Sequence, residues 1–508
     1  MSQFDTSNKH HFLFQTEELE FHILGGLGAY SLDRLKVTLK VNRCEDEFNA
    51  IRHNLDLYNH NGVEKFVRRI AEYLEISTGI IRRSLQELIH LLENYRIEVL
   101  DKAEEKEAEE YLLEKKERRS AMDFLKAKHL LRNTNRYIGQ SGVIGEETNR
   151  LLMYLIFTSR KMENPLHCVS FGSSGSGKTH LQSKVAELIP EEERLSLTSL
   201  SSNSFYYFKK NELKNKLVLI EDLDGADDVL YPLRELQTKK RISKSVVQKS
   251  LGGQGKTTNL VVEGPVSVAG CTTKESLYED NSNRSFLLYI DESEEQDERI
   301  MNYQRKMSAG KVNYQEEIDA QTLLKNVQRL LTSVTVRNPF AEYLTLPKSV
   351  FKPRRTNAHY LQFIEAVTFY HQHQRESKFD TQTGEEYIET TLDDIKMAND
   401  LIKGTLLRKS DSLNGATRNY LERLKAYLGM KKREMFTNSE IRKNLRIAES
   451  SLRRYHNLLV QEGYLKKQET PVGSSFSYVI VDVDEFGDLE KSINKALDVC
   501  LESLLIEK

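Results

Sequence analysis

Apolar positions follow three kinds of pattern along the chain. Within the first 60 residues they alternate with polar positions, which predicts β-strands in HHFLF, ELEFHIL and RLKVTLKV and a glycine turn at 25–28. From residue 61 to residue 128 they recur every three or four positions, as in amphipathic helices. Farther on, unbroken apolar runs predict buried parallel strands at Cys168–Phe171, Lys216–Ile220 and 265–271. The order of these patterns indicates an α/β core that follows a β-rich region and a helical region.

The strand at Cys168–Phe171 leads into the sequence GSSGSGKT and then into a helical pattern. This is the G-x-x-x-x-G-K-T spacing of a phosphate-binding loop in its strand–loop–helix context. Glycine leaves backbone N–H groups open to a phosphate chain and permits left-handed turns, and the helix adds its positive N-terminal end. Lys178 is expected on the β- and γ-phosphates, and Thr179 on Mg²⁺. We therefore predict that ATP and Mg²⁺ are bound by Gly172, Ser173, Ser174, Gly175, Ser176, Gly177, Lys178, Thr179 and His180.

Carboxylates and hydroxyls end two later strands. Glu221 and Asp222 follow one apolar run, and Thr272 and Thr273 end another. The carboxyl ends of parallel strands meet at one edge of a sheet. One acid can therefore hold the water shell of Mg²⁺ while the other polarises the attacking water, and the sequence leaves the two roles open. A helix N-cap is the alternative role for the acids. The hydroxyls are expected to contact either the γ-phosphate or the attacking water.

Two β-like segments, 241–248 and 258–263, are joined by a glycine-rich stretch that carries Lys249 and Lys256. This predicts a hairpin whose flexible tip grips a phosphate backbone without reading its sequence. A plain surface hairpin is the alternative. Arg284 precedes the next core strand, where it can reach a nucleotide in a neighbouring subunit, although an intramolecular salt bridge would also account for it.

Residues 436–482 have the pattern of a winged helix. Asn438 or Ser439 is expected to cap a short helix that ends at Leu445, and a second helix and two strands around 471–475 follow. The charges suit phosphate contacts, although the domain could equally bind a protein. We predict DNA contacts at Arg453, Arg454 and Lys466. An amphipathic helix over 489–505 is expected to pack on this domain.

Composition limits the classes of partner. The chain has 74 Lys and Arg against 76 Asp and Glu, so nucleic-acid contacts must come from local basic patches. The four cysteines are widely spaced without a C-x-x-C pair, which argues against a disulfide framework or a zinc finger. The N-terminus has no signal-peptide pattern and no 18-residue apolar run follows, so we expect a cytoplasmic protein with no membrane partner.

In this order the parts resemble the AAA+ ATPase core of the MCM-like branch, which carries a hairpin before its sensor-1 strand and a short arginine-finger motif. The chain resembles more closely the helicase-like half of bacterial and mobile-element primase–helicase proteins, over most of residues 10–420. The segments that carry this resemblance are 145–150, 170–179, 262–266, 283–284, 338–342, 370–375 and 387–392.

The resemblance implies roles for single residues. These are ATP binding at Lys178 and Thr179, metal and water handling at Glu221 and Asp222, sensor 1 at Thr272 or Thr273, a finger acting on the neighbouring subunit at Arg284, and a lid sensor at Arg354 or Arg355. This sequence departs from the family in two ways. Glu221 precedes Asp222, whereas the usual order is Asp then Glu, and the zinc-finger motif of the primase half is absent, so priming is not implied.

We therefore expect an α/β fold: an AAA+ P-loop NTPase core, with helices on both faces of a parallel sheet, a hairpin before sensor 1, an α+β N-terminal region and a C-terminal winged helix. The predicted parts are a β-rich domain, a helical region or connecting arm, the ATPase core, a helical lid with linker, and the winged helix with its C-terminal helix, at 1–60, 61–130, 131–340, 341–415 and 416–508.

The predicted function is that of an ATP-dependent DNA helicase or translocase. Its expected state is an oligomeric ring, namely a hexamer, with single-stranded or forked DNA and a separate primase as partners. The alternative is a DNA-bound AAA+ switch that assembles on DNA and recruits partners in transposition, plasmid control or phage defence.

Overall fold

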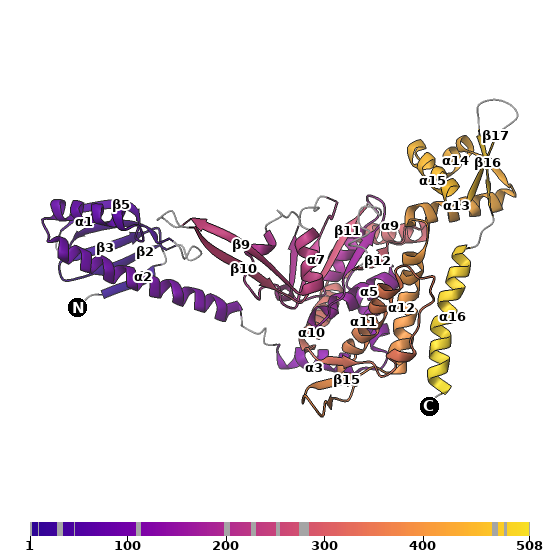
Figure 1. The fold of residues 1–508 in the computed structure, drawn as a ribbon, viewed down its shortest axis with the longest axis horizontal. Coiled ribbons are helices and arrows are strands. Elements are labelled where there is room, and N and C mark those ends of the chain that lie inside the picture. The colour runs from indigo at the N-terminus through magenta and orange to yellow at the C-terminus, as the bar shows by residue number, and fades with distance from the viewer. Residues whose placement is uncertain are drawn as a thin grey trace. The chain divides into compact units, whose positions relative to one another are not determined.

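The computed structural model describes residues 3–8, 10–27, 34–44, 46–107, 113–197, 204–224, 230–249, 255–273, 284–469, 476–481 and 485–506 (Figure 1). The chain forms two compact units, Met1–Leu112 and Leu113–Lys508. This division differs from the predicted boundaries at residues 60 and 130. The physical reason is that the predicted helical region contains helices that complete two different cores.

The first unit is a five-stranded antiparallel sheet in the order β1-β2-β3-β4-β5, followed by two helices. Alternation along the strands puts Phe12, Phe21 and Leu39 on one face, where Phe66 of α1 and Leu85 of α2 cover them. The sheet therefore needs these helices and does not form a separate domain of 60 residues. The elements are β1 (Gln3–Asn8), β2 (His11–Gln15), β3 (Leu19–Leu24), β4 (Lys36–Arg43), β5 (Asp46–Asp56), α1 (His60–Leu74) and α2 (Thr78–Glu107). The expected turn at 25–28 lies partly outside the described residues.

The second unit contains a parallel five-stranded sheet in the order β12-β6-β11-β8-β7. Successive side chains of its strands enter two different apolar clusters, so both faces are buried. Helices α5 and α6 cover one face and α7 covers the other. The strands are β6 (Cys168–Phe171), β7 (Arg194–Leu197), β8 (Lys216–Ile220), β11 (Val266–Thr272) and β12 (Phe286–Tyr289), and the helices are α5 (Glu147–Thr158), α6 (Lys178–Ala186) and α7 (Leu230–Lys239).

Further helices extend the cluster on the α5 side of the sheet. Helix α3 packs on α10, and its Ala121 and Leu125 are fully buried there, which explains why it belongs to the second unit. The remaining elements of this region are α3 (Lys115–Lys126), α4 (Leu130–Gln140), α9 (Glu294–Ser308), α10 (Tyr314–Leu330) and the short 3-10 helices η1 (Ser159–Lys161), η2 (Glu191–Glu193), η3 (Ser204–Tyr207) and η6 (Ala341–Tyr343). Strands β9 (Arg241–Lys249) and β10 (Gly255–Glu263) form an antiparallel hairpin before β11.

The predicted helical lid is not wholly helical. Between helices α11 and α12 the chain forms two short strands that pair with a third, in the order β13-β15-β14. The turn between β14 and β15 includes Gly384, whose φ of +71° favours glycine, and the Asp380 carboxylate, which accepts backbone N–H bonds. The elements are β13 (Thr335–Arg337), α11 (Pro353–Tyr370), η7 (Gln372–Gln374), β14 (Lys378–Phe379), β15 (Glu386–Glu389) and α12 (Leu392–Ser410).

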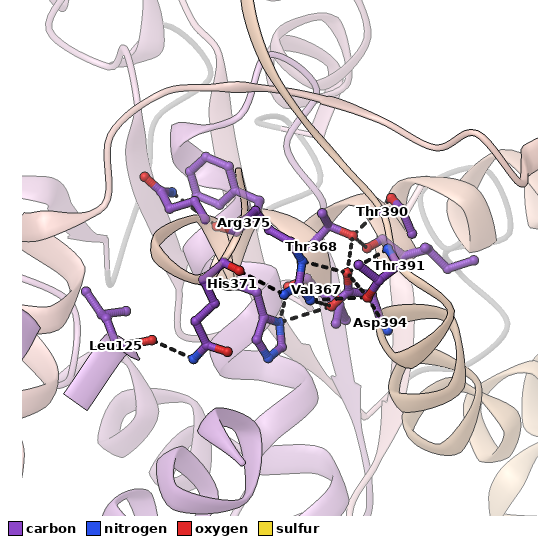
Figure 2. A network of polar contacts seen from close by, with 12 residues as sticks. Leu125, Val367, Thr368, His371, Arg375, Thr390, Thr391 and Asp394 are labelled. Carbon is purple, nitrogen blue, oxygen red and sulfur yellow. Dashed lines mark hydrogen bonds and ion pairs between the residues drawn. The ribbon is translucent and has the colours of Figure 1, made fainter. Parts of the chain in front are cut away.

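A buried polar network joins α11 to α12 and includes parts of two segments that carry the family resemblance (Figure 2). The Asp394 carboxylate is fully buried and accepts bonds from Arg375 at 2.5 Å and from the Thr391 backbone at 3.0 Å. His371 lies 3.3 Å from the same carboxylate. Gln374 donates to Leu125 O at 2.6 Å and so links α3 to the network. The segment 370–375 therefore acts structurally, by fixing three helices relative to one another.

The segment predicted as a winged helix, together with the helix before it, contains three helices and a three-stranded antiparallel sheet among its described residues, with the strand order β16-β18-β17. The cap of its second helix is Thr437, whose side chain accepts from Glu440 N, and not Asn438 or Ser439. Asn438 is instead bonded to the buried His456. The elements are α13 (Gly415–Lys431), β16 (Met435–Thr437), α14 (Asn438–Leu445), α15 (Glu449–Gln461), β17 (Leu465–Glu469) and β18 (Phe476–Ile480). Residues 471–475 lie outside the described ranges.

The prediction that the C-terminal helix packs on the winged-helix segment is wrong for most of α16 (Glu485–Ile506). Its Ile493, Leu497 and Leu504 are buried in the same apolar cluster as α11 and α12, and Cys500 lies beside Thr345. Its first turn contacts the predicted winged-helix segment and the helix before it, through Glu485 with Tyr464 and Phe486 with Arg418. An amphipathic helix shows that it has a buried face, but not which surface covers that face. No helix among the described residues is both long and apolar enough to cross a membrane.

Candidate nucleotide-binding site

The loop between β6 and α6 has the backbone that its glycines predict. Gly175 and Gly177 have φ angles of +83° and +91°, and a Cβ atom on either would meet nothing within 4 Å. Both therefore serve the left-handed turn and leave the approach to the backbone open. A Cβ atom on Gly172 would lie 2.6 Å from Ser176 Oγ, so this first glycine permits the tight closure of the loop.

Lys178 begins α6 and turns back over the loop. Its ammonium donates to Gly172 O at 2.9 Å and to Ser173 O at 2.5 Å, and the side chain is only 7% exposed. The Ser176 hydroxyl is buried without a hydrogen-bond partner. The loop thus holds a cation and an unpaired hydroxyl at the place where a phosphate chain would meet exposed N–H groups. His180 is exposed one turn into the helix, and Ser173 and Ser174 are exposed in the loop.

The ends of three strands bring the predicted chemical groups together around Cys271. Burial raises the pKa of this thiol to about 12, while the Thr179 hydroxyl and the Lys178 ammonium act in the opposite direction. The Asp222 and Glu221 carboxylates add to the rise. These interactions place the loop lysine, the hydroxyl and both exposed acids within electrostatic reach of one side chain.

Asp224 is a residue that the sequence prediction missed. Its carboxylate accepts from the hydroxyls of both Thr272 and Thr273, the latter at 2.7 Å, and from Thr273 N at 3.1 Å. Its own N–H donates to Asp222 Oδ1 at 2.8 Å. Each threonine hydroxyl has one proton, which it gives to Asp224, so its lone pairs are left as acceptors. This arrangement favours contact with an attacking water over contact with a phosphate oxygen. The only local signal was a third acid in the sequence Glu-Asp-Leu-Asp.

A second acidic side chain reaches the loop from the segment after β12. Glu292 Oε1 accepts from Ser173 N at 2.6 Å. The preceding Asp291 donates its N–H to Glu146 at 2.7 Å, and burial raises the pKa of Glu146. Arg150 in turn donates to Val143 O at 2.9 Å and to Gly145 O. The segment 145–150, which carries the resemblance, thus braces the chain beside the phosphate loop.

Arg408 in the last turn of α12 is a further cation that the sequence prediction missed. Its guanidinium lies 5.8 Å from the centre of the Tyr289 ring, and that ring stacks on Phe171, the residue before the loop. The Nη1 atom of Arg408 is buried without a hydrogen-bond partner in the structure. Nothing in the local sequence distinguishes this arginine, because α12 approaches β12 only through the tertiary fold.

Arg284 lies at the opposite end of the sheet from the phosphate loop. It precedes β12, donates to Thr238 Oγ1 at 3.1 Å and, with burial, lowers the pKa of His167 to about 3. The sheet therefore separates this arginine from the loop of its own chain.

The predicted lid sensors Arg354 and Arg355 are not brought to the phosphate loop at the carboxyl end of the sheet. They start α11, and Arg355 acts electrostatically on His359 and Lys409. The His359 ring stacks 5.4 Å from Phe286 at the amino end of β12. The prediction placed them by their distance along the chain, whereas the packing of α11 on β12 decides where they lie.

The predicted DNA-contacting residues are distributed over two separate places. Lys249 ends β9, and Lys256 pairs with Gln248 inside β10, so the strands extend farther than predicted. The tip itself, 250–254, lies outside the described residues. Arg453 is exposed on α15 and paired with Glu449 at 2.5 Å, while Arg454 and Lys466 are exposed.

The residues present fit a nucleotide with Mg²⁺. The loop offers a buried, unpaired Ser176 hydroxyl and the Lys178 ammonium, whose hydrogen bonds among the described residues go to two backbone carbonyls of the loop. Thr179 and the exposed Glu221 and Asp222 supply hard oxygen ligands of the kind that Mg²⁺ prefers. Among the described residues no group of three or more His, Cys, Asp or Glu could hold a metal alone.

Comparison with known proteins bears on the same region. Residues 114–333 match the family described as "MTBMA_p00010 P-loop domain". The uncharacterized protein MTBMA_p00010 of Methanothermobacter marburgensis is 25% identical over 291 residues, which are 54% of this chain and 34% of that protein. The chain therefore spans about a third of the length of this relative.

Two solved structures also align, each with a TM-score of only 0.23. One is Drosophila ORC bound to DNA, at 11% identity over 77% of this chain and 94% of that chain. The other is the apo C-terminal region of NrS-1, at 12% identity over 69% of this chain and 74% of that chain. Neither similarity has weight for the argument. The family match and the strand–loop–helix geometry together identify residues 114–333 as an α/β P-loop domain.

Proposed function

We propose that this protein is an ATPase of the AAA+ type that converts ATP hydrolysis into movement along DNA. The observation that carries the first half is the convergence of Lys178, Thr179, Glu221, Asp222 and Thr272 at the carboxyl ends of neighbouring strands. P-loop enzymes need these groups in one place, since they act by positioning and by stabilising charge.

Each residue of the site has a separate role in the proposed hydrolysis of ATP. The loop N–H groups and Lys178 hold the β- and γ-phosphates, and Thr179 with one of the acids holds the cation. Bound Mg²⁺ supplies neutralisation of the phosphate charge. The other acid, Glu221 or Asp222, accepts the proton of the attacking water. Asp224 keeps the lone pairs of Thr272 and Thr273 turned toward that water.

Completion of the site by a neighbouring copy follows from the position of Arg284. This arginine lies at the amino end of the sheet, whereas the loop lies at the carboxyl end. A guanidinium so placed can stabilise charge on phosphate only in a second copy. The proposed active form is therefore an oligomer, with a closed ring as its expected shape.

The second half of the proposal concerns DNA. The hairpin β9–β10 is followed directly along the chain by β11, and β11 leads to the threonines that face the water. A change in structure at the nucleotide site can therefore move the hairpin. Lys249 and Lys256 near its end suit contact with a phosphate backbone. The activity that follows is that of a helicase or translocase. A switch that assembles on DNA without unwinding it is the second candidate, supported by the exposed arginines of α15.

Lys178→Ala tests the first half. We expect ATP turnover to be abolished, because removal of the ammonium leaves phosphate charge uncompensated. Lys184→Ala is the matched control, because this half-buried lysine of the same helix is paired with Glu187. Turnover in Lys178→Ala equal to that of the wild type would refute the site.

The double variant Lys249→Ala with Lys256→Ala tests the second half. We expect weaker binding of single-stranded DNA and a smaller salt dependence of that binding, because a protein with fewer phosphate contacts releases fewer counterions when it binds. Forked DNA separates the two candidates: strand separation with ATP supports the helicase, and ATP-dependent assembly without separation supports the switch.

A further inference from the structure

Helix α9 projects from the P-loop domain with little packing of its own. Gln296 is its only buried residue, and it donates to Ile144 O at 2.8 Å. Tyr303 donates to Glu317 of α10 at 2.7 Å. Met301 and Met307 are 44% and 42% exposed. A helix of 15 residues with so little tertiary contact is marginal in water, so a missing partner would account for it.

The first turns of α9 carry an unneutralised acidic surface, which we define as Glu294, Glu295 and Asp297. All three are exposed, and the ion pairs of the described residues include none of them. Glu294 and Glu295 line a shallow hollow of about 520 Å³ with Glu298, Arg299 and Asn302. Like charges this close repel one another, so this surface favours a cationic partner.

The first turn of α11 carries a matching basic surface, which we define as Lys352, Arg354 and Arg355. All three are exposed, and the described residues provide no ion pair to any of them. Beneath them lies Lys409, which is only 9% exposed. Burial and the nearby charges of Arg355 and Lys352 lower the pKa of Lys409 to about 8. The helix N-terminus adds its own positive end, so this surface favours an anionic partner.

The two surfaces lie toward opposite ends of one strand. The acidic surface follows the carboxyl end of β12, and the basic surface is joined to its amino end through His359, which stacks on Phe286. Contact of either surface with itself would oppose like charges, whereas contact of one surface with the other in a second copy places unlike charges together. Such a contact can close a two-fold dimer or repeat head to tail from copy to copy.

We propose that the acidic surface of α9 docks on the basic surface of α11 in a second copy of this chain. The proposal rests on the oligomeric form of the proposed function and specifies which faces meet. Glu292, two residues before the acidic surface, accepts from Ser173 N of the phosphate loop. Docking at α9 is therefore transmitted to the site that binds phosphate.

Charge reversal in the full-length chain tests the contact. One variant carries Glu294→Lys, Glu295→Lys and Asp297→Lys, and the other carries Lys352→Glu, Arg354→Glu and Arg355→Glu. Particle mass is measured with a non-hydrolysable ATP analogue, so that the readout does not depend on turnover. We expect each variant alone to need at least a tenfold higher concentration to assemble, and wild-type assembly to weaken as salt rises.

Combining the two sets of charge reversals gives the decisive result. An equimolar mixture of the two variants, or all six changes in one chain, restores unlike charges at every contact and should restore assembly. The control for the first variant is Glu342→Lys with Glu376→Lys and Glu462→Lys, which makes the same change in net charge as that variant at exposed sites elsewhere. Its assembly should equal that of the wild type.

The possible failures can be told apart. If the wild type assembles and both reversed variants assemble equally well, the proposed faces are wrong, whereas the oligomeric ATPase stands. Loss of assembly without recovery in the mixture also overturns the contact, since a general defect would then explain the loss. A wild type that stays monomeric with nucleotide and DNA refutes the oligomer and this contact together.

Discussion

Replacement of Asp224 by asparagine is the sharpest test of the site chemistry. The carboxylate holds three donors, namely the hydroxyls of Thr272 and Thr273 and the Thr273 N–H. Asparagine keeps one oxygen acceptor and replaces the other with an N–H₂ group, which can only donate. A threonine hydroxyl that faces this group must accept from it, so that lone pair no longer faces the water.

The size of the effect follows from these bonds. A hydrogen bond to a charged group contributes about 1.5–3 kcal/mol, and a neutral one about 1 kcal/mol. The difference over the donors that are lost or weakened is about 1–3 kcal/mol. Each 1.4 kcal/mol of lost transition-state stabilisation is about tenfold in rate, so we expect kcat to fall about 10- to 100-fold.

Steady-state ATPase kinetics measures this prediction. Because the P-loop and not Asp224 holds the phosphates, the affinity for ATP should change less than threefold, and the loss should appear in kcat. The control Asp319→Asn changes an exposed carboxylate on α10 and should leave both constants unchanged. A kcat for Asp224→Asn within threefold of the wild type would show that the threonines do not position water.

Two further predictions concern the packing behind the site and the effect of pH. Gly270→Ala should destabilise the P-loop domain by about 1–3 kcal/mol and lower turnover, because the new Cβ would lie 2.6 Å from the side chain of Leu223, the residue between Asp222 and Asp224. The control is Gly404→Ala, whose Cβ would meet nothing within 4 Å. Denaturant titration compares the stability of the two variants. Burial raises the pKa of Glu365 to about 7, so the folded state retains a proton that the unfolded chain releases. This contribution to stability is complete at acidic pH and is lost as the pH rises through about 7, and it amounts to about 1–3 kcal/mol. Thermal unfolding between pH 5 and 8 should show the slope in the wild type and a flatter curve in Glu365→Gln; parallel curves would contradict the assignment.

The parts of the site that the sequence predicted are those with a local cause. The glycine spacing of the phosphate loop determines its backbone, and the apolar runs before it and before Glu221 determine buried parallel strands. The residues that sequence reasoning missed depend on tertiary contacts. Asp224, Glu292 and Arg408 reach the site from three different segments, and none has a spacing that distinguishes it from other charged residues.

The errors in the fold have the same origin. The apolar face of α16 was recognised, but amphipathicity does not identify the surface that covers it. The strands β14 and β15 are short, and the pairing of β15 with β13 spans some fifty residues, so no local pattern predicts them. The cap at Thr437 was misplaced by one or two residues because Thr, Asn and Ser all suit that position.

The return of α16 to α12 has a mechanical consequence for the module between them. The chain leaves α12, forms α13 to β18, and comes back through a helix that is buried against its point of departure. A segment that is connected to the rest of the fold at both ends can adopt fewer orientations than one that is connected by a single linker, because closing the loop restricts its conformational freedom. We therefore expect its orientation relative to the P-loop domain to be restricted by both connections.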